Sequence, residues 1–239
     1  MLSVIIPVFN EEKTILKLLS VVFRVKPRKE VIIVNDASSD GTRTILNLIE
    51  KRLSDGSLKY PYLSNFKVLS KKINEGKGAA VRDGYKLATG NLFLVQDADL
   101  EVDPHEYEKL LAPIEEGRAD IVFGSRLLDS KNHRKFELPS LYANLFLTFF
   151  SNIFTRINMT DMETCYKLFP SSIISNYDLK SNRFGIEPEL AAYAGKEVAR
   201  GKKYCEVPIS YYPRKHSAGK KISWWDGVKA IFGVIKLKI

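Results

Sequence analysis

Residues 91–104 of the chain are NLFLVQDADLEVDP, and this stretch contains one complete structural unit. Its first part, 91–97, is apolar almost throughout, which is typical of a strand that is covered on both faces. Two carboxylates, Asp97 and Asp99, then follow with one residue between them. An Asp-Pro pair at 103–104 is a start signal for a helix. The stretch therefore predicts a buried strand that ends in paired acids and leads into a helix.

The same unit recurs along the first half of the chain. Apolar, β-branched runs predict further strands at 2–8, 31–35, 66–70 and 119–125. Amphipathic segments with start signals at Asn10, Asp40 and Gly76 predict the helices between them. Strands that alternate with helices imply right-handed crossovers and a mostly parallel sheet. We therefore expect an α/β fold, a Rossmann-like sheet flanked by helices.

The alternation becomes irregular after Arg126. An uncharged aromatic stretch follows at 138–155, and 185–197 has the pattern of a helix. A last strand is expected within 203–212, and a C-terminal amphipathic helix is expected from about Trp224. With no repeat and no low-complexity linker, we expect a single domain over 1–239.

The composition is that of an ordinary globular protein, with 45% hydrophobic and 27% charged residues, which excludes disordered and fibrous classes. The chain has 37 basic and 28 acidic residues, so its net charge is 37 − 28 = +9. From Lys196 onward, eleven basic and three acidic residues contribute +8 of this charge. Such a concentration predicts one basic face and an anionic partner. Because aromatic residues are not interleaved with the basic ones in a stacking pattern, we expect no nucleic acid as partner.

Two cysteines are too few for a disulfide framework, which favours a reducing, cytoplasmic compartment. The apolar start at 2–9 lacks a basic segment and a cleavage site, so we expect a strand there and no signal peptide. The stretch 138–155 is free of charge but contains Pro139, Asn144 and Asn152. We expect it to lie on a membrane and not to cross it.

Ligands bind outside the carboxyl ends of the strands in open parallel sheets. Asp97 and Asp99 stand at such an end, where both can reach one hard cation that also binds phosphate oxygens. The acidic Glu101 lies just downstream. A solvated acidic turn that caps the next helix is the alternative interpretation.

Two further strand ends have polar residues with two interpretations each. Asp36 could accept hydrogen bonds from a base or a ribose, or it could cap a helix; Asp40 fits the cap better, which would leave Asp36 free. Gly76 and Lys77 open a helix and could meet an anion, or the glycines of 74–78 could simply form a tight turn. The chain has neither a Walker A loop nor a GxGxxG motif.

Several segments occur in an order and spacing that resemble family 2 glycosyltransferases with the GT-A fold. They are VIIPVFNEE (4–12), VIIVNDASSDGT (31–42), NEGKGAAVRDGY (74–85), VQDADLE (95–101) and VFGSR (122–126). Three later segments are similar to the branch that contains dolichyl-phosphate mannose and glucose synthases and bacterial polyprenyl-phosphate enzymes. They are DMETCYKLF (161–169), FGIEPEL (184–190) and VPISYYPRKHSAGKKIS (207–223). Glu101 departs from the Gln of many relatives, and Cys165-Tyr166 departs from a Gly-Phe pair.

The resemblance implies an inverting enzyme that moves a hexose from a nucleotide-diphosphate sugar, UDP-glucose or GDP-mannose, to a polyprenyl or dolichyl phosphate. It implies a donor-binding half over 1–126 and a membrane-facing acceptor half over 127–239, with Mg²⁺ or Mn²⁺ held by Asp97, Asp99 and Glu101. Catalytic positions would be Asp97, Asp99, Arg126 and Arg214. Substrate-binding positions would be Pro7, Val8, Asn10, Glu11, Asp36, Gly76, Lys77, Ala98 and Lys221.

The acceptor is left open between a phosphate and a hydroxyl group. A lipid phosphate arrives as an anion, because its second pKa is about 6, and needs no general base. A glycan hydroxyl would need a carboxylate base, for which Asp161 and Glu163 are the candidates. A nucleotidyltransferase is a more remote alternative, since PVFNEE stands where its glycine loop should be. A glycosidase would use two carboxylates and no metal.

The final segment completes the expected membrane surface. Trp224, Trp225 and later apolar residues recur at helical spacing, with lysines beside them, which favours an interfacial helix on an anionic membrane. Packing on the sheet or in a dimer is the alternative. We therefore expect a cytoplasmic protein peripheral to the inner face of the membrane, and the sequence leaves its oligomeric state open.

Overall fold

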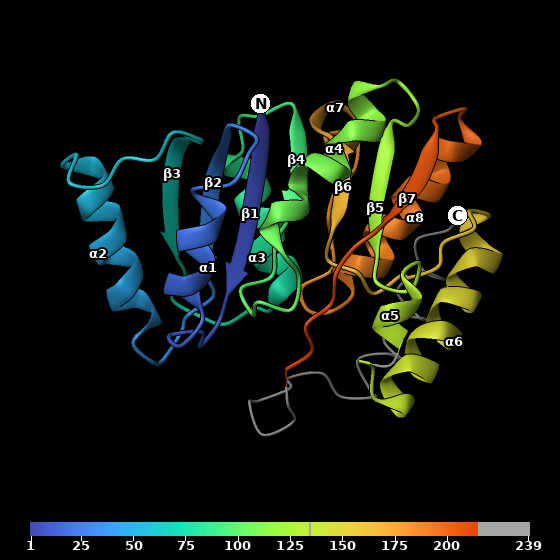
Figure 1. Cartoon of the computed structure of the whole chain (residues 1–239), viewed down its shortest axis with the longest axis horizontal. Coiled ribbons are helices and arrows are strands. Elements are labelled where there is room, and N and C mark those ends of the chain that lie inside the picture. The colour runs from blue at the N-terminus through green and yellow to red at the C-terminus, as the bar shows by residue number, and fades with distance from the viewer. Residues whose placement is uncertain (134, 215–239) are drawn as a thin grey trace.

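The structure is a computed structural model that describes residues 1–133 and 135–214 (Figure 1). Its strands are β1 (Leu2–Val8), β2 (Lys29–Asn35), β3 (Leu63–Ser70), β4 (Leu92–Val95), β5 (Ile121–Ser125), β6 (Lys167–Pro170) and β7 (Tyr204–Pro208). Its helices are α1 (Ile15–Val22), α2 (Thr42–Ser54), α3 (Lys77–Leu87), α4 (Tyr107–Glu115), α5 (Ser130–His133), α6 (Leu138–Thr155), α7 (Ser171–Ile174) and α8 (Ile186–Ala199), with a 3-10 helix η1 (Pro104–Glu106) before α4. The expected C-terminal amphipathic helix from Trp224 lies outside the described residues.

The strands form one sheet in the order β3-β2-β1-β4-β6-β5-β7 (Figure 1). Neighbouring strands are parallel except at β6, which is antiparallel to both β4 and β5. The predicted α/β fold with a mostly parallel sheet is therefore confirmed. The chain builds outward from β1 to β3 and then returns to β4 on the other side of β1. The strand order thus reverses between β1 and β4, where open α/β sheets bind their ligands.

Both faces of the sheet are covered, which explains why its central strands are apolar almost throughout. Val4 and Ile6 of β1 pack on the side of α1, α2 and α4. Ile5 points the other way and packs on the side of α3 and α8. Alternate residues of one strand therefore belong to two separate cores, which fix the position of β1 between the helix layers.

Two details differ from the sequence prediction. The start signal at Asn10 predicts a helix directly after it, but α1 begins only at Ile15, because Asn10 is left-handed with φ 54° and the next residues form a turn on the carbonyl of Glu11. β6 is a strand that the sequence pattern does not reveal. It is only four residues long and begins with Lys167, whose side chain is buried and whose Nζ donates to the carbonyl of Met162.

Helix α6 coincides with the uncharged aromatic stretch. A typical surface helix buries its apolar side chains and exposes its polar ones, and α6 does the opposite. Its buried residues are polar: Asn144, Thr148, Ser151 and Thr155. Its large apolar side chains are 44% to 66% exposed: Leu138, Tyr142, Leu145, Phe146, Phe149 and Ile153. Within the described part of the chain, no helix combines the length and the apolar character needed to cross a membrane.

Candidate active site

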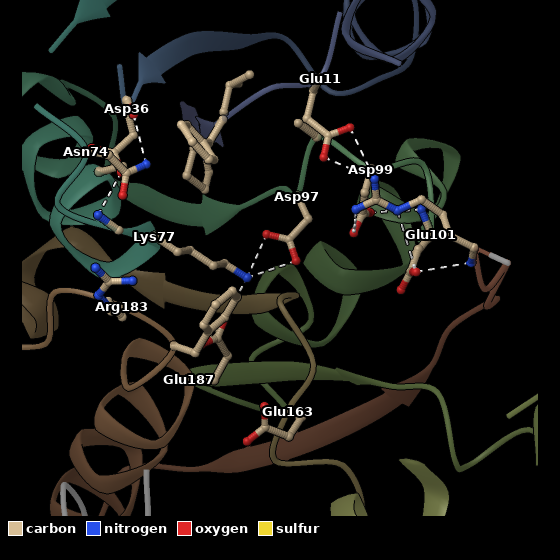
Figure 2. Close-up of a pocket in the computed structure, with 18 of the residues that line it drawn as sticks. Glu11, Asp36, Asn74, Lys77, Asp97, Asp99, Glu101, Glu163, Arg183 and Glu187 are labelled. Carbon is tan, nitrogen blue, oxygen red and sulfur yellow. Dashed lines mark hydrogen bonds and ion pairs between the residues drawn. The ribbon is translucent and has the colours of Figure 1, made fainter. Parts of the chain in front are cut away.

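A cleft of about 340 Å³ opens at the carboxyl ends of β1 and β4, at the reversal of strand order. Its lining includes most of the residues that the sequence singles out (Figure 2). From the predicted set it contains Pro7, Val8, Glu11, Asp36, Gly76, Lys77, Asp97, Ala98, Asp99, Glu101, Arg126 and Arg214. Residues from both halves of the sequence thus meet in one place.

Asp97 leaves β4 and pairs with Lys77 at the start of α3. The Nζ atom of Lys77 lies 2.6 Å and 2.8 Å from the two carboxylate oxygens of Asp97, and 2.5 Å from Oε1 of Glu187 on α8. Figure 2 shows Lys77 reaching between the two acids. Burial disfavours the charge on Lys77, but Asp97 and Glu187 outweigh burial and raise its pKa well above the usual value. The positively charged Lys77 therefore lies in the cleft as predicted, and two carboxylates hold its side chain in place.

A buried glutamine fixes the backbone immediately before Asp97. The amide oxygen of Gln96 accepts hydrogen bonds from the hydroxyls of Tyr107 and Tyr166, both at 2.7 Å, and its amide nitrogen donates to the carbonyl of Asp97 at 3.0 Å. Gln96 is fully buried. A satisfied polar network of this kind restricts the strand end to one conformation.

Asp99 and its neighbours hold Arg214. The guanidinium of Arg214 lies 3.2 Å from Asp99 and 3.1 Å from Glu11, and the backbone N–H of Arg214 donates to Glu101 at 3.1 Å. Burial, together with the charges of Asp97 and Glu101, raises the pKa of Asp99 to about 7, and Arg214 opposes this rise. Several acids therefore compete for one cation at the end of the described chain.

Asp36 lines the cleft, but its carboxylate is not free. It accepts hydrogen bonds from the backbone N–H groups of Glu75 and Gly76, at 3.1 Å and 2.7 Å, and lies 3.4 Å from Nζ of Lys71. The expectation of an unengaged Asp36 is thus wrong, because the acid holds the following loop in place. Asp40 comes close to its predicted role: it lies one residue before the N-cap Gly41, and its carboxylate accepts from the N–H of Thr42, the first residue of α2.

The glycines of the loop at 74–78 permit close packing. Gly76 has φ +98°, and a Cβ there would lie 2.6 Å from the carbonyl oxygen of Asn182. The N–H groups of Gly78 and Ala79 donate to the carbonyls of Arg183 and Asn182. The N–H groups of Gly78 and Ala79 are therefore used within the protein, which agrees with the tight-turn interpretation. The side chain of Lys77 faces the cleft and is available as a cation for an anion.

Arg126 follows β5 and is held by a bidentate ion pair. Its Nε and Nη2 lie 2.7 Å and 2.8 Å from the two oxygens of Asp161, which also accepts from the side chain of Asn144 on α6 at 2.8 Å. Asp161 is completely buried. Burial opposes its charge, but Arg126 outweighs burial and keeps the pKa of Asp161 below its usual value. Arg126 is thereby fixed in the cleft wall and tied to α6.

Glu163 is the second acid of the segment before β6, and it lines the cleft (Figure 2). Burial and the charge of Glu187 raise its pKa to about 7, although Lys167 and Arg126 oppose the rise. Of the two carboxylates that the sequence offers as bases, Asp161 is occupied by Arg126. Glu163 is therefore the one of these two candidates that lines the cleft.

Among the predicted residues that the structure describes, Asn10 is absent from the cleft lining. The Asn10 side chain instead accepts from the N–H of Ser39, and so joins the loops after β1 and β2. Lys221 lies outside the described residues. The cleft also contains residues that the sequence analysis did not select: Phe9, Asn74, Ala80, Arg183, Phe184 and Glu187. Phe184 and Glu187 belong to the FGIEPEL segment. The resemblance of this segment to known enzymes was the signal from which they could have been selected.

The carboxylates that follow β4 are arranged as ion pairs with cationic side chains. Among the described residues, no three His, Cys, Asp or Glu side chains are arranged to hold one ion. Asp97 and Asp99 instead each have a cationic side chain as partner. The set of two or three hard oxygen donors at a strand end nevertheless has the chemistry that Mg²⁺ and Mn²⁺ prefer.

Comparison with known proteins identifies the class. The chain matches the model of the family described as glycosyl transferase family 2 over residues 3–178. The protein therefore belongs to this family and is a glycosyltransferase.

The similar proteins agree with this assignment. The chain is 26% identical over 248 residues to a UDP-N-acetylglucosamine–dolichyl-phosphate N-acetylglucosaminyltransferase of Methanococcus voltae, covering 100% of this chain and 96% of that one. It is 27% identical over 259 residues to a dolichyl-phosphate β-glucosyltransferase of Trichomonas vaginalis, covering 100% and 73%. The structure of glucosyl-3-phosphoglycerate synthase from Mycobacterium tuberculosis, solved with Mn²⁺ and UDP, has a TM-score of 0.68 at 14% identity, covering 100% and 80%. At this low identity, the similarity to the last protein shows the fold alone.

Proposed function

We propose that this enzyme transfers a hexose from a nucleotide-diphosphate sugar to a polyprenyl phosphate at the surface of an anionic membrane, and that it uses Mg²⁺ or Mn²⁺. One observation carries the choice of acceptor. Arg126 stands in the cleft wall and is linked through Asp161 to Asn144 on α6, whose opposite side is apolar and exposed. The contacts of Asp161 with Arg126 and with Asn144 thus connect a cation that could bind a phosphate to a surface that could bind a lipid.

The donor would occupy the side of the cleft formed by β1, β2 and β4. Pro7 and Val8 offer apolar contacts for a base, and Asp36 lies at the same edge. Asp97 and Asp99 would hold the cation on the diphosphate, which requires that their pairs with Lys77 and Arg214 rearrange. When bound, the cation would stabilise negative charge on the leaving diphosphate. Lys77 and Arg214 would then be free to face the same developing charge.

The proposed contact with a membrane rests on the apolar side chains that α6 exposes to solvent. Contiguous exposed apolar patches mark surfaces that bind other proteins or membranes. An interfacial helix buries such a face among lipid chains, and basic residues near it favour anionic lipids. The net charge of +8 after residue 195 would contribute that attraction. The protein would then act at the inner face of the membrane without spanning it.

The mechanism is simplest with a phosphate acceptor. Arg126 would bind the acceptor phosphate and hold it against the donor sugar, and the phosphate oxygen needs no base because it is already ionised. A glycan hydroxyl remains a second candidate acceptor because Glu163 lines the cleft with a pKa near neutrality. Asp161 no longer qualifies as the base, since Arg126 occupies both of its oxygens.

The test is a transfer assay with UDP-glucose, GDP-mannose and UDP-N-acetylglucosamine as donors. Each is offered with a polyprenyl phosphate in vesicles or with a soluble glycan, with Mn²⁺ or with a chelator. We expect transfer to the lipid phosphate with one donor, loss of transfer with the chelator, and at least a hundredfold loss in Arg126→Ala. Glu163→Gln should keep most of the lipid transfer. Transfer to the glycan that Glu163→Gln abolishes and Arg126→Ala preserves would overturn the proposal.

A further inference from the structure

A second hollow lies beside the cleft, on the outer side of the acceptor half. It is an apolar groove of about 400 Å³ between α6 and the segments that follow β5 and precede β6. Leu141, Leu145 and Phe149 line it from α6, and Leu127, Met159 and Thr160 line it from the other side. None of the described residues that line it is charged.

Residues that line the groove are direct chain neighbours of residues that form the wall of the cleft. Leu127 of the groove directly follows Arg126 of the cleft, and Thr160 of the groove directly precedes Asp161, the partner of Arg126. The hydroxyl of Thr160 lies 2.6 Å from the hydroxyl of Ser125, which joins the two walls at this point. A ligand bound to Arg126 through an anionic group therefore has the groove as the adjoining surface.

The polar atoms in the groove are already used within the protein. The side-chain amide of Asn152 exchanges hydrogen bonds with the backbone of Met159, at 2.8 Å and 3.0 Å. The hydroxyl of Thr148 accepts from the N–H of Met162 at 2.9 Å, and that of Thr160 donates to Glu206 at 2.7 Å. Because a polar ligand would find no unused partner among these groups, the groove suits an apolar chain.

We propose that this groove binds the isoprene units next to the phosphate of the acceptor, an inference that rests on the proposed function. The acceptor is apolar along its chain and anionic at one end, and the groove with Arg126 at its end has the complementary arrangement. The first units would lie along Leu145 and Phe149, so that the phosphate is delivered to Arg126 in one orientation. The enzyme would then recognise the chain itself as well as its attachment to a membrane.

Binding of soluble prenyl monophosphates tests the groove without any membrane. The full chain is titrated calorimetrically with dimethylallyl, geranyl and farnesyl phosphate, which have one, two and three isoprene units, below the concentrations at which they form micelles. We expect affinity to increase by about tenfold or more from one to three units, as burial of additional apolar carbons requires. Equal affinities for all three would overturn the groove.

Leu145→Asp introduces a charge into the groove at a side chain that is 44% exposed, so the fold should tolerate it. This variant should bind all three ligands as weakly as the shortest one. Leu48→Asp, at a 52% exposed leucine on α2, is the matched control and should retain the length dependence. Phe146→Asp, on α6 but outside the groove lining, should retain it as well. Loss of the length dependence in Phe146→Asp to the same degree would overturn the assignment to the groove.

Transfer to the same ligands separates this proposal from the proposed function. Length-dependent binding without transfer to any prenyl phosphate would contradict the proposed function and leave the groove standing. Transfer that continues while binding is independent of chain length would contradict the groove and leave the proposed function standing.

Discussion

The guanidinium of Arg214 lies 3.2 Å from the carboxylate of Asp99, and it also contacts Glu11 at 3.1 Å. One cationic side chain from the far end of the described chain thus neutralises acids that follow β1 and β4. A divalent ion bound by Asp99 would have to displace this side chain. The pair therefore couples the position of the segment at 209–214 to the charge state of the cleft.

Arg214→Ala should have opposite effects on ion binding and on transfer. Removing a cation from three acids should strengthen Mn²⁺ binding in the absence of donor by roughly threefold to tenfold, as expected for partly exposed ion pairs. Transfer should fall because the diphosphate loses a stabilising charge. Mn²⁺ binding is measured by electron paramagnetic resonance, with Arg118→Ala, an exposed arginine paired with Glu116, as the control. Unchanged or weaker Mn²⁺ binding in Arg214→Ala would show that Arg214 does not compete with the ion.

Asp161→Asn should destabilise the protein strongly. Asp161 is completely buried and neutralises Arg126, which is only 14% exposed in the cleft wall, so the variant leaves a largely buried guanidinium without its counter-charge. Breaking a buried pair in this way costs about 3–5 kcal/mol of unfolding free energy. Chemical denaturation measures the loss. Glu116→Gln removes an exposed ion pair and should cost less than about 1 kcal/mol. Equal losses in both variants would contradict the role of Asp161 as a buried anchor.

Glu163→Gln should change how stability depends on pH. The pKa of Glu163 is raised from 4.5 to about 7 by burial and by Glu187, against the opposing charges of Lys167 and Arg126. Between these two values the folded state binds more protons than the unfolded state, so the free energy of unfolding falls as the pH rises. Glu163→Gln removes this loss. We expect it to be more stable than the parent by about 1–3 kcal/mol above pH ~8.

The same two proteins should be equally stable below pH ~4, where Glu163 is protonated in both the folded and the unfolded state. Urea denaturation across the pH range measures the difference. A constant difference at all pH values would mean that the ionisation of Glu163 is not its cause.

Phe146→Asp and Ile153→Asp should detach the protein from membranes without unfolding it. Both side chains belong to the exposed face of α6, at 59% and 56% exposure. A charge there should weaken binding to anionic vesicles at low salt by at least about tenfold. Unfolding free energies should stay within about 0.5 kcal/mol of the parent. Sedimentation with vesicles measures binding, with Leu48→Asp as the control. Vesicle binding that survives both changes would rule out α6 as the docking surface.

The donor side of the cleft could be predicted because its signals are local. Asp97 and Asp99 directly follow an apolar run, and the run determines both the strand and the position of the acids at its end. The same holds for Pro7 and Val8 at the end of β1. In a parallel sheet, strand ends meet at one edge, so local patterns suffice to bring these residues together.

The partners within the cleft could not be predicted, because they depend on contacts between distant segments. Lys77 meets Glu187 only because α8 packs beside the start of α3. Asp36 accepts hydrogen bonds from the backbone of residues 75 and 76, and nothing in the sequence of its own strand predicts these bonds. β6 is short and begins with a buried lysine, so its pattern is not that of a strand. Yet β6 brings Glu163 to the cleft and Asp161 to Arg126 in the cleft wall, because an antiparallel strand begins where its parallel neighbours end.

The exposed apolar face of α6 also has a practical consequence for the purified protein. The described part of the chain leaves this apolar face exposed, so molecules should associate through it as the concentration rises, well before they unfold. Colloidal stability and fold stability are then separate properties of this enzyme, and a mild detergent should improve the first without changing the second. The helix that would give access to a lipid substrate would also limit the concentration at which the enzyme stays in solution.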